Sequence, residues 1–197
     1  MSLYSQTPDL TRNLMKKLLV ISTLLLAACC ARAQNSTMAG VRFYAQPSVV
    51  YVFPGDFKNA TGEAIALGAL INDQHSLEVE AIWFSTHDKS NTFIKVDFMP
   101  LLASYKYHFP SHNGVSGYFG AAAGSTSEHL TADFGSILGS YKTSSTVFTY
   151  GLQAGVTYAL GSSVDLDFGG KVLRMNQSGI TTEGNISMLT AGLRFRF

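Results

Sequence analysis

The stretch Met188-Leu189-Thr190-Ala191-Gly192-Leu193-Arg194-Phe195-Arg196-Phe197 decides the fold of this chain. Its odd-numbered positions are Leu, Ala, Leu, Phe and Phe, and its even-numbered positions are Met, Thr, Gly, Arg and Arg. Successive side chains of a β-strand point to opposite faces, so this alternation makes one face apolar and the other polar. The pattern predicts a strand that separates an apolar environment from a polar one.

The same period-two alternation recurs along the chain. The segments that we expect to form strands are residues 41–53, 63–71, 76–85, 92–109, 115–124, 147–160, 163–172 and 188–197. Small residues dominate 115–124, so the phase of that strand cannot be read. In 92–109 the apolar phase reverses around Pro100, which cannot donate to a strand ladder, and we expect a β-bulge there. Together the segments predict an all-β fold of eight antiparallel strands.

The connections between these segments alternate in length. Short turns fall at residues 72–75, 110–114 and 161–162, and longer polar loops fall at 54–62, 86–91, 125–145 and 175–185. In an up-and-down barrel this order places every long loop at one end and every short turn at the other. The asymmetry is typical of bacterial outer-membrane barrels, which turn their long loops to the outside.

The composition restricts how the chain could meet a membrane. Charged residues make up 14% and aromatic residues 12% of the 197 residues, and no apolar run of about 20 residues follows residue 30, so we expect no transmembrane helix. The other structure that satisfies its backbone in lipid is a closed barrel. From Gln34 onward the chain has 10 basic and 12 acidic residues, a net charge of −2, and no basic stripe that would indicate nucleic acid.

Residues 1–33 have the pattern of a secretory signal peptide. Lys16 and Lys17 precede an apolar run, and Ala31-Arg32-Ala33 matches an A-x-A cleavage site, so we expect the barrel to comprise residues 34–197. Translation starting at Met15 would suit this leader better. A second interpretation stays open, because Leu26-Ala27-Ala28-Cys29 is similar to a lipobox and Cys29 would then be lipidated. Cleavage after Ala33 removes both cysteines of the chain and excludes disulfides.

The alternation alone does not say which face meets lipid, and a soluble lipocalin-like barrel would turn its apolar face inward. The opposite face is rich in Gly, Ala, Ser and Thr, which suits the crowded lumen of an eight-stranded barrel. Aromatic residues also recur near the ends of segments, as membrane-interface girdles require. These residues are Tyr51, Phe53, Trp83, Tyr107, Phe109 and Tyr158. We therefore expect the apolar face to contact lipid.

The lumen is then expected to collect five acids and five bases. These are Glu78, Glu80, Asp97, Asp165 and Asp167, with Lys95, Lys106, Lys171, Arg194 and Arg196. Charges enclosed in a barrel are tolerated when they are paired and hydrogen-bonded. We expect a closed, charge-paired lumen without an open channel.

No motif indicates an enzyme, a cofactor or a metal. His108 and His112 do not converge in a strand and turn as they would on a helix. His129 lies beside Glu128, with Ser125 and Ser127 near, but a hydrolase triad is defined by geometry, and a loop would not orient these residues. We expect no catalytic residue, no cofactor and no bound metal.

Three stretches resemble small OmpA/OmpX-type outer-membrane β-barrel proteins: residues 97–109, with an apolar-Pro-apolar core before Tyr-Lys-Tyr; the Gly-rich strand 151–160; and the closing Arg-Phe-Arg-Phe. The resemblance covers residues 38–197. It implies an eight-stranded barrel in outer-membrane lipid, with Phe197 recognised by the barrel-assembly machinery.

The function expected from these patterns is structural, adhesive or partner-binding, with four loops presented to the outside. Two alternatives stay open: a lipid-modifying outer-membrane enzyme and a soluble ligand-binding barrel.

Overall fold

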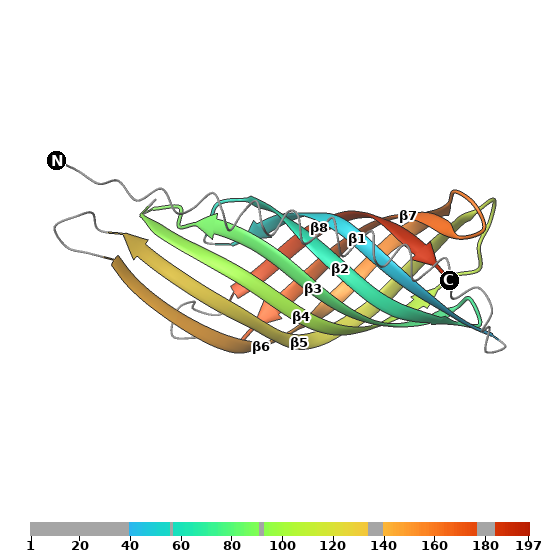
Figure 1. Ribbon diagram of the computed structural model, residues 1–197, viewed down its shortest axis with the longest axis horizontal. Helices are drawn as coiled ribbons and strands as arrows, with labels where there is room; N and C mark the ends of the chain where they lie inside the picture. The colour runs from blue at the N-terminus through green and yellow to red at the C-terminus, as the bar shows by residue number, and fades with distance from the viewer. Residues whose placement is uncertain (1–39, 56, 91–92, 134–139, 177–183) are drawn as a thin grey trace. The chain divides into compact units, whose positions relative to one another are not determined.

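The computed structural model describes residues 40–55, 57–90, 93–133, 140–176 and 184–197, and there eight antiparallel strands close into a barrel (Figure 1). The strands are β1 (Val41–Pro54), β2 (Ala60–Ile71), β3 (His75–His87), β4 (Ile94–His108), β5 (Val115–Asp133), β6 (Ser140–Ala159), β7 (Val164–Met175) and β8 (Gly184–Arg196). In this part of the chain no helix is long and apolar enough to cross a membrane. The predicted signal peptide, with Met15 and Cys29, lies outside the described residues.

Each strand pairs with its neighbours in sequence, and β8 pairs with β1 to close the barrel. The register fixes how strongly the strands tilt. One continuous line of paired residues runs through Val41, Ile71, His75, Tyr107, Phe119, Ala154, Gly170, Leu189 and Tyr51. The line returns to β1 ten residues further along the strand. Eight tilted strands leave an interior just wide enough for side chains to fill.

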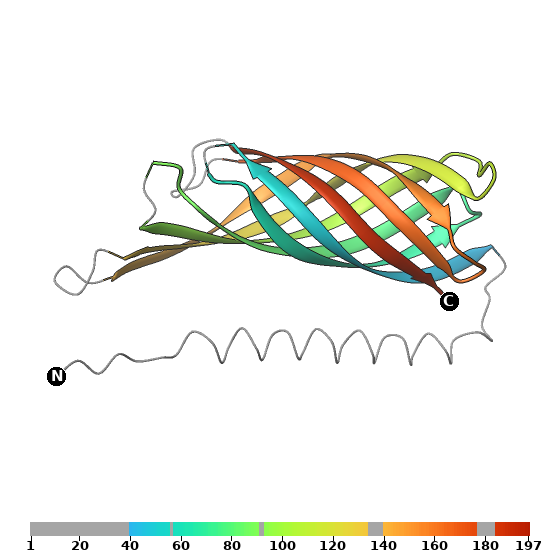
Figure 2. The ribbon, with the colours of Figure 1, turned by 90° about the horizontal axis from the view of Figure 1, so that it is seen from above.

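The two ends of the barrel differ. At the turn end, β1 begins, β8 ends and three short turns connect β2 to β3, β4 to β5 and β6 to β7 (Figure 2). Asn72 and Asp73 both have positive φ, as do Asn113 and Gly114, which is the geometry of tight hairpin turns. The opposite end, which we call the loop end, carries the other four connections, and they differ less in length than the sequence predicted: they have 5, 6, 6 and 8 residues, against 3, 6 and 4 at the turn end.

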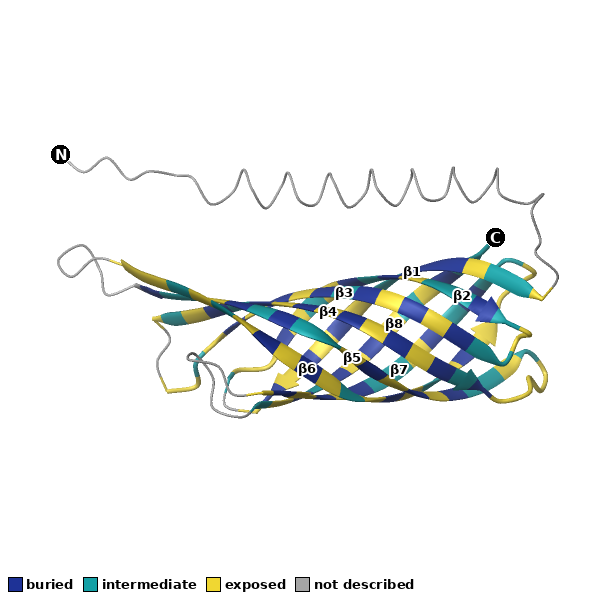
Figure 3. Ribbon diagram, turned by 90° about the horizontal axis from the view of Figure 1, so that it is seen from below, coloured by how far each residue is buried: buried dark blue, intermediate teal, exposed yellow. Residues whose placement is uncertain are grey.

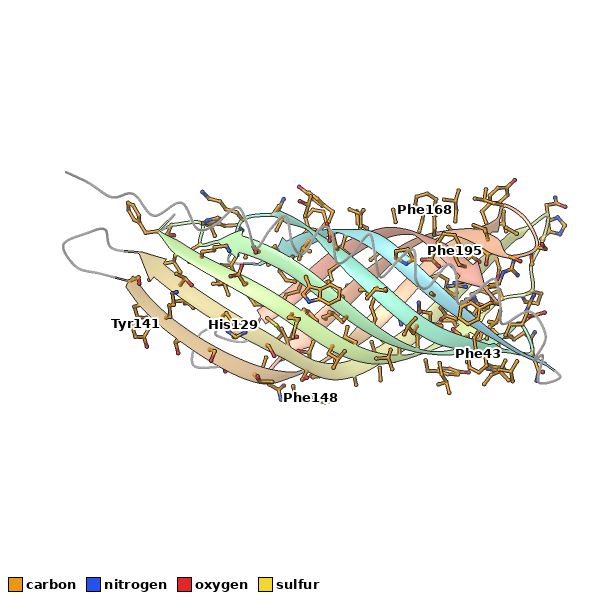
Figure 4. All side chains as sticks on the ribbon, viewed as in Figure 1. Phe43, His129, Tyr141, Phe148, Phe168 and Phe195 are labelled. Carbon is orange, nitrogen blue, oxygen red and sulfur yellow. The ribbon has the colours of Figure 1, made fainter. Side chains whose placement is uncertain are left out.

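The apolar face of the strands points outward. Buried and exposed residues alternate along every strand, and the ribbon is chequered as a result (Figure 3). Phe43, Phe148 and Phe168 project away from the barrel wall (Figure 4) and are about half exposed, and Leu152 is 69% exposed. Such a surface suits lipid rather than water. The prediction that the apolar face lies outside is confirmed, and the soluble lipocalin-like alternative is wrong.

The bulge expected at Pro100 is not present. Pairing of β4 with β5 continues in one register from Ile94–Ala132 to His108–Tyr118, straight through Pro100. Pro100 lacks an N–H, and only two ladder pairs with β3 are missing around it. The alternation therefore keeps its phase, and Val96 and Phe98 face the lumen.

The loop expected at residues 125–145 was also wrong in its extent. β5 continues to Asp133 and β6 starts at Ser140, and the two strands stay paired to the end. Ser and Thr dominate this region, so it has no apolar stripe from which to recognise a strand. Threonine nevertheless favours strands, and a paired neighbour satisfies the backbone. The hairpin extends the barrel wall at the loop end (Figure 1).

Candidate functional site

Three buried ion pairs fill the half of the lumen nearest the turn end. Lys106 Nζ lies 2.8 Å from Glu78 Oε2, and Arg194 Nη2 lies 3.0 Å from Asp167 Oδ2. Lys171 pairs with Glu80 and thereby joins β7 to β3 on the opposite side of the barrel. We call these six residues the charged layer.

Two tyrosines hold the charged layer in place. The Tyr44 hydroxyl donates to Glu78 Oε2 at 2.8 Å, and the Tyr118 hydroxyl donates to Asp167 Oδ1 at 3.1 Å. Arg194 also lies over the Tyr44 ring, 4.7 Å from its centroid, and donates from Nε to the Gln46 side chain at 3.1 Å. Glu78, Asp167 and Arg194 thus each have both an ionic and a further hydrogen-bonding partner, which is what makes buried charges tolerable.

Glycines give the tyrosines room. The Tyr118 hydroxyl occupies the space that a Cβ at Gly155 or Gly169 would need, and the Tyr44 ring does the same at Gly68. A glycine opposite a large ring allows the ring to lie flat against the wall of a narrow lumen.

The other predicted lumen charges lie elsewhere. Arg196 Nη2 pairs with Asp165 Oδ1 at 2.8 Å beside the turn end, where both side chains are largely buried. Lys95 and Asp97 pair with each other at 2.8 Å, but their side chains are 45% and 40% exposed on the outer face. The prediction that Lys95 and Asp97 face the lumen was wrong, because it assumed a bulge at Pro100 that would have reversed their orientation.

The half of the lumen nearest the loop end holds a cluster of apolar side chains, which the sequence analysis missed, beside the buried polar residues Thr126, Glu128 and Thr149. Every strand contributes to this cluster, which we call the apolar layer. Its residues are Val50, Val52, Ala60, Ala64, Ile82, Phe84, Val96, Phe98, Leu102, Ala122, Val147, Leu173, Met175, Ile186 and Met188. Thr126 and Thr149 face the lumen near this layer, and their hydroxyls bond to each other at 2.7 Å.

The change between the layers can be followed on single strands. On β3 the inward residues run Ser76, Glu78 and Glu80, and then Ile82 and Phe84. On β7, Asp167 and Lys171 give way to Leu173 and Met175 in the same manner. Because every second residue faces inward, this switch from polar to apolar was visible in the sequence as a break in the polar face of these two strands.

The residues considered for metal binding or hydrolysis do not form a site. His108 is buried in the lumen, with Nε2 3.1 Å from the Ser76 hydroxyl, whereas His112 is exposed in a turn. Glu128 is buried and faces the lumen, whereas His129, its neighbour on β5, is exposed on the outer face. Within the described part of the chain no three His, Asp or Glu side chains gather as a metal ion would require.

A second candidate site is the protruding β5–β6 hairpin. Residues 140–147 of β6 pair with β5, but the pairing of β6 with β7 begins only at Thr149 and Met175. Among the described residues, one edge of β6 is therefore without a neighbouring strand over these eight residues. The hairpin carries His129 and Tyr141, the latter 60% exposed near its tip (Figure 4).

A closed barrel of eight tilted antiparallel strands, apolar outside and charged within, is a transmembrane β-barrel. The family model described as "Outer membrane protein beta-barrel domain" matches residues 21–197, and the chain belongs to this family. It is a protein of the bacterial outer membrane.

Solved structures share this fold at low sequence identity. Neisserial surface protein A is 22% identical, with a TM-score of 0.65 over 81% of this chain and 100% of that one. Ail, the attachment invasion locus protein of Yersinia pestis, is 16% identical, with a TM-score of 0.52 over 81% of this chain and 100% of that one. No curated protein sequence matches the chain.

Proposed function

We propose that this barrel is a closed, non-enzymatic anchor that presents its loop end, and above all the β5–β6 hairpin, to a partner outside the cell. The observation that carries the proposal is the edge of β6 at residues 140–147, which has no neighbouring strand among the described residues. An exposed strand edge is a template for an added strand, and main-chain hydrogen bonds then give affinity for an extended polypeptide. The partner class that fits is a protein with an extended segment.

The edge is polar, which suits a site that must stay soluble until it meets its partner. Its sequence is Ser-Tyr-Lys-Thr-Ser-Ser-Thr-Val. A lysine in an exposed edge strand discourages uncontrolled pairing of copies. Ail, one of the similar structures, is named the attachment invasion locus protein, and its shared fold makes adhesion an activity to test here.

The test shortens β5 and β6 at the loop end. Deleting residues 127–133 together with 140–146 removes seven β5–β6 pairs and the six pairs that hold Ile94–Met99 of β4 against β5, and it keeps the remaining β5–β6 pairs in register. Cells that display the full protein should adhere to a protein-coated surface, and cells that display the shortened protein should not. Heat-modifiable migration in detergent gels shows that the shortened barrel still folds. Equal adhesion by both would contradict the proposal.

The closed lumen is part of the same proposal and is supported by the paired charges and the apolar layer. The absence of enzymatic activity is also proposed, and mass spectra of lipid A from cells with and without the protein test it. A modified lipid A that depends on the protein would favour the lipid-modifying enzyme instead. Recognition of Phe197 by the assembly machinery remains a prediction.

A further inference from the structure

We propose that the apolar layer alone seals the barrel, and that the charged layer beneath it is a binding site for water. The inference rests on the proposed closed lumen and says which half closes it. The sequence had predicted a closed, charge-paired lumen without distinguishing the two halves.

The first observation is a set of buried polar atoms without partners in the charged half. Among the described residues, Glu78 Oε1, Ser104 Oγ and both amide atoms of Gln153 make no hydrogen bond. Leaving such groups unpaired costs about 1–3 kcal/mol each, so folded proteins rarely do so. All three side chains are more than nine-tenths buried.

These atoms lie around one part of the lumen. Ser104 is the register partner of Glu78. One line of pairs joins Lys106, Gly120, Gln153 and Lys171, and Lys171 reaches across to Glu80. The orphaned set includes a carboxylate oxygen, a hydroxyl, an amide donor and an amide acceptor. Water both donates and accepts, and buried waters typically bridge groups of this kind with about three hydrogen bonds.

The second observation is the apolar lining of the lumen in the apolar layer, from which we expect water to be excluded. Ile82, Leu102 and Leu173 are at most 1% exposed. Ile82 and Leu102 come from the neighbouring strands β3 and β4, and Leu173 comes from β7 across the barrel. Apolar constrictions exclude water and ions by dewetting. Neutral ion pairs do not, because each charge retains oxygen or nitrogen atoms that water can bind. The seal therefore belongs to the apolar layer.

The test compares proton leak through proteoliposomes loaded with a pH-sensitive dye. The variant Ile82→Ser/Leu102→Ser/Leu173→Ser opens the apolar layer to water, and we expect its leak to exceed that of the wild type by about tenfold or more, since a wetted constriction conducts. The matched control places three serines on the lipid face of the same strands, Val79→Ser/Leu101→Ser/Val172→Ser, and should leak like the wild type. All three positions are at least half exposed.

A fourth protein decides between the layers. The variant Glu80→Gln/Lys171→Met removes the ion pair that crosses the charged layer, and its leak should be far below that of the triple variant. Leak through this variant but not through the triple variant would overturn the inference. Leak through the wild type would instead defeat the proposed closed lumen.

Folding of each variant is checked by heat-modifiable migration, and a measurement on the wild type covers the case in which the triple variant fails to fold. Water-edited solid-state NMR in bilayers should show rapid transfer from water to the Gln153 amide and the Glu78 carboxyl. Transfer to the methyl groups of Ile82 and Leu173 should be slow. Equal transfer to both layers, or none to Gln153, would overturn the inference.

Discussion

Arg194 is the residue on which most of the charged layer depends. It pairs with Asp167, donates to Gln46 and stacks on Tyr44, and it is 2% exposed. Arg194→Leu leaves Asp167 as a buried charge without its ionic partner, which should lower the free energy of unfolding by about 3–5 kcal/mol. Urea unfolding in detergent micelles measures the change.

The control for this prediction is a pair on the outer face. Lys95 and Asp97 are both close to half exposed, so Lys95→Ala should cost no more than about 0–1 kcal/mol. Similar losses from the two substitutions would mean that Arg194 is solvated and that the charged layer is not a buried network.

Glycine at position 169 can be tested in the same way. A Cβ there would overlap the Tyr118 hydroxyl and lie 3.1 Å from Thr190 Oγ1. Gly169→Ala should push Tyr118 away from Asp167 and destabilise the barrel by about 1–3 kcal/mol, as overpacking usually does. Gly161→Ala is the matched control, because nothing lies within 4 Å of its Cβ position. Unchanged unfolding of Gly169→Ala would show that Tyr118 has no fixed position.

Among the elements, β4 shows where alternation is a reliable guide and where it is not. Alternation in a strand is set by geometry, so the inward position of Lys106 and the outward position of Tyr105 could be predicted. Between Pro100 and the loop end, the inward residues of β4 are themselves apolar. An apolar residue such as Val96 therefore does not identify the lipid face there. The error for Lys95 and Asp97 came from applying one rule to both halves of the barrel.

The β5–β6 hairpin escaped prediction for a different reason. Its strands leave the apolar band, and with water on the outer face the sequence needs no apolar stripe. These residues are extended because they pair with neighbouring strands, and strand pairing cannot be read from a local sequence pattern. Residues 127–133 and 140–146 match each other in register but have no pattern of their own.

The hairpin predicts how the protein tolerates insertion. An epitope placed after residue 136, between the last pair of β5 and β6, should leave folding intact, because each doubling of a loop's length costs only about 0.6 kcal/mol. Antibody should reach it on intact cells. The same epitope after Asp73, at the turn end, should be reached only after permeabilisation. Labelling of the second site on intact cells would reverse the proposed orientation.

At the scale of the whole molecule, the sequence predicted the barrel but not the division of its lumen into a charged layer and an apolar layer. The strand number and the outward apolar face both follow from local alternation and turn residues, whereas the predicted difference in connection length between the two ends is smaller in the structure. Which acid meets which base depends on the register, and Lys171 meets Glu80 across a distance of 91 residues in sequence. No local pattern encodes such a contact. The sequence therefore predicted which charged residues face the lumen, but not which acid pairs with which base.

The whole barrel makes one electrical prediction. Purified protein in planar bilayers should show no large, stable single-channel conductance, because side chains fill the lumen of eight strands. The four ion pairs formed by Glu78, Glu80, Asp165 and Asp167 with Lys106, Lys171, Arg194 and Arg196 carry no net charge to attract permeating ions. Salt screens buried pairs far less than exposed ones, so raising the electrolyte from about 0.1 to 1 M should not open the barrel. Protein-free bilayers with the same detergent give the baseline. A conductance that appears at high salt would show that the electrolyte reaches the pairs and that they hold the lumen shut by themselves. Large channels at every salt concentration would make the protein a pore.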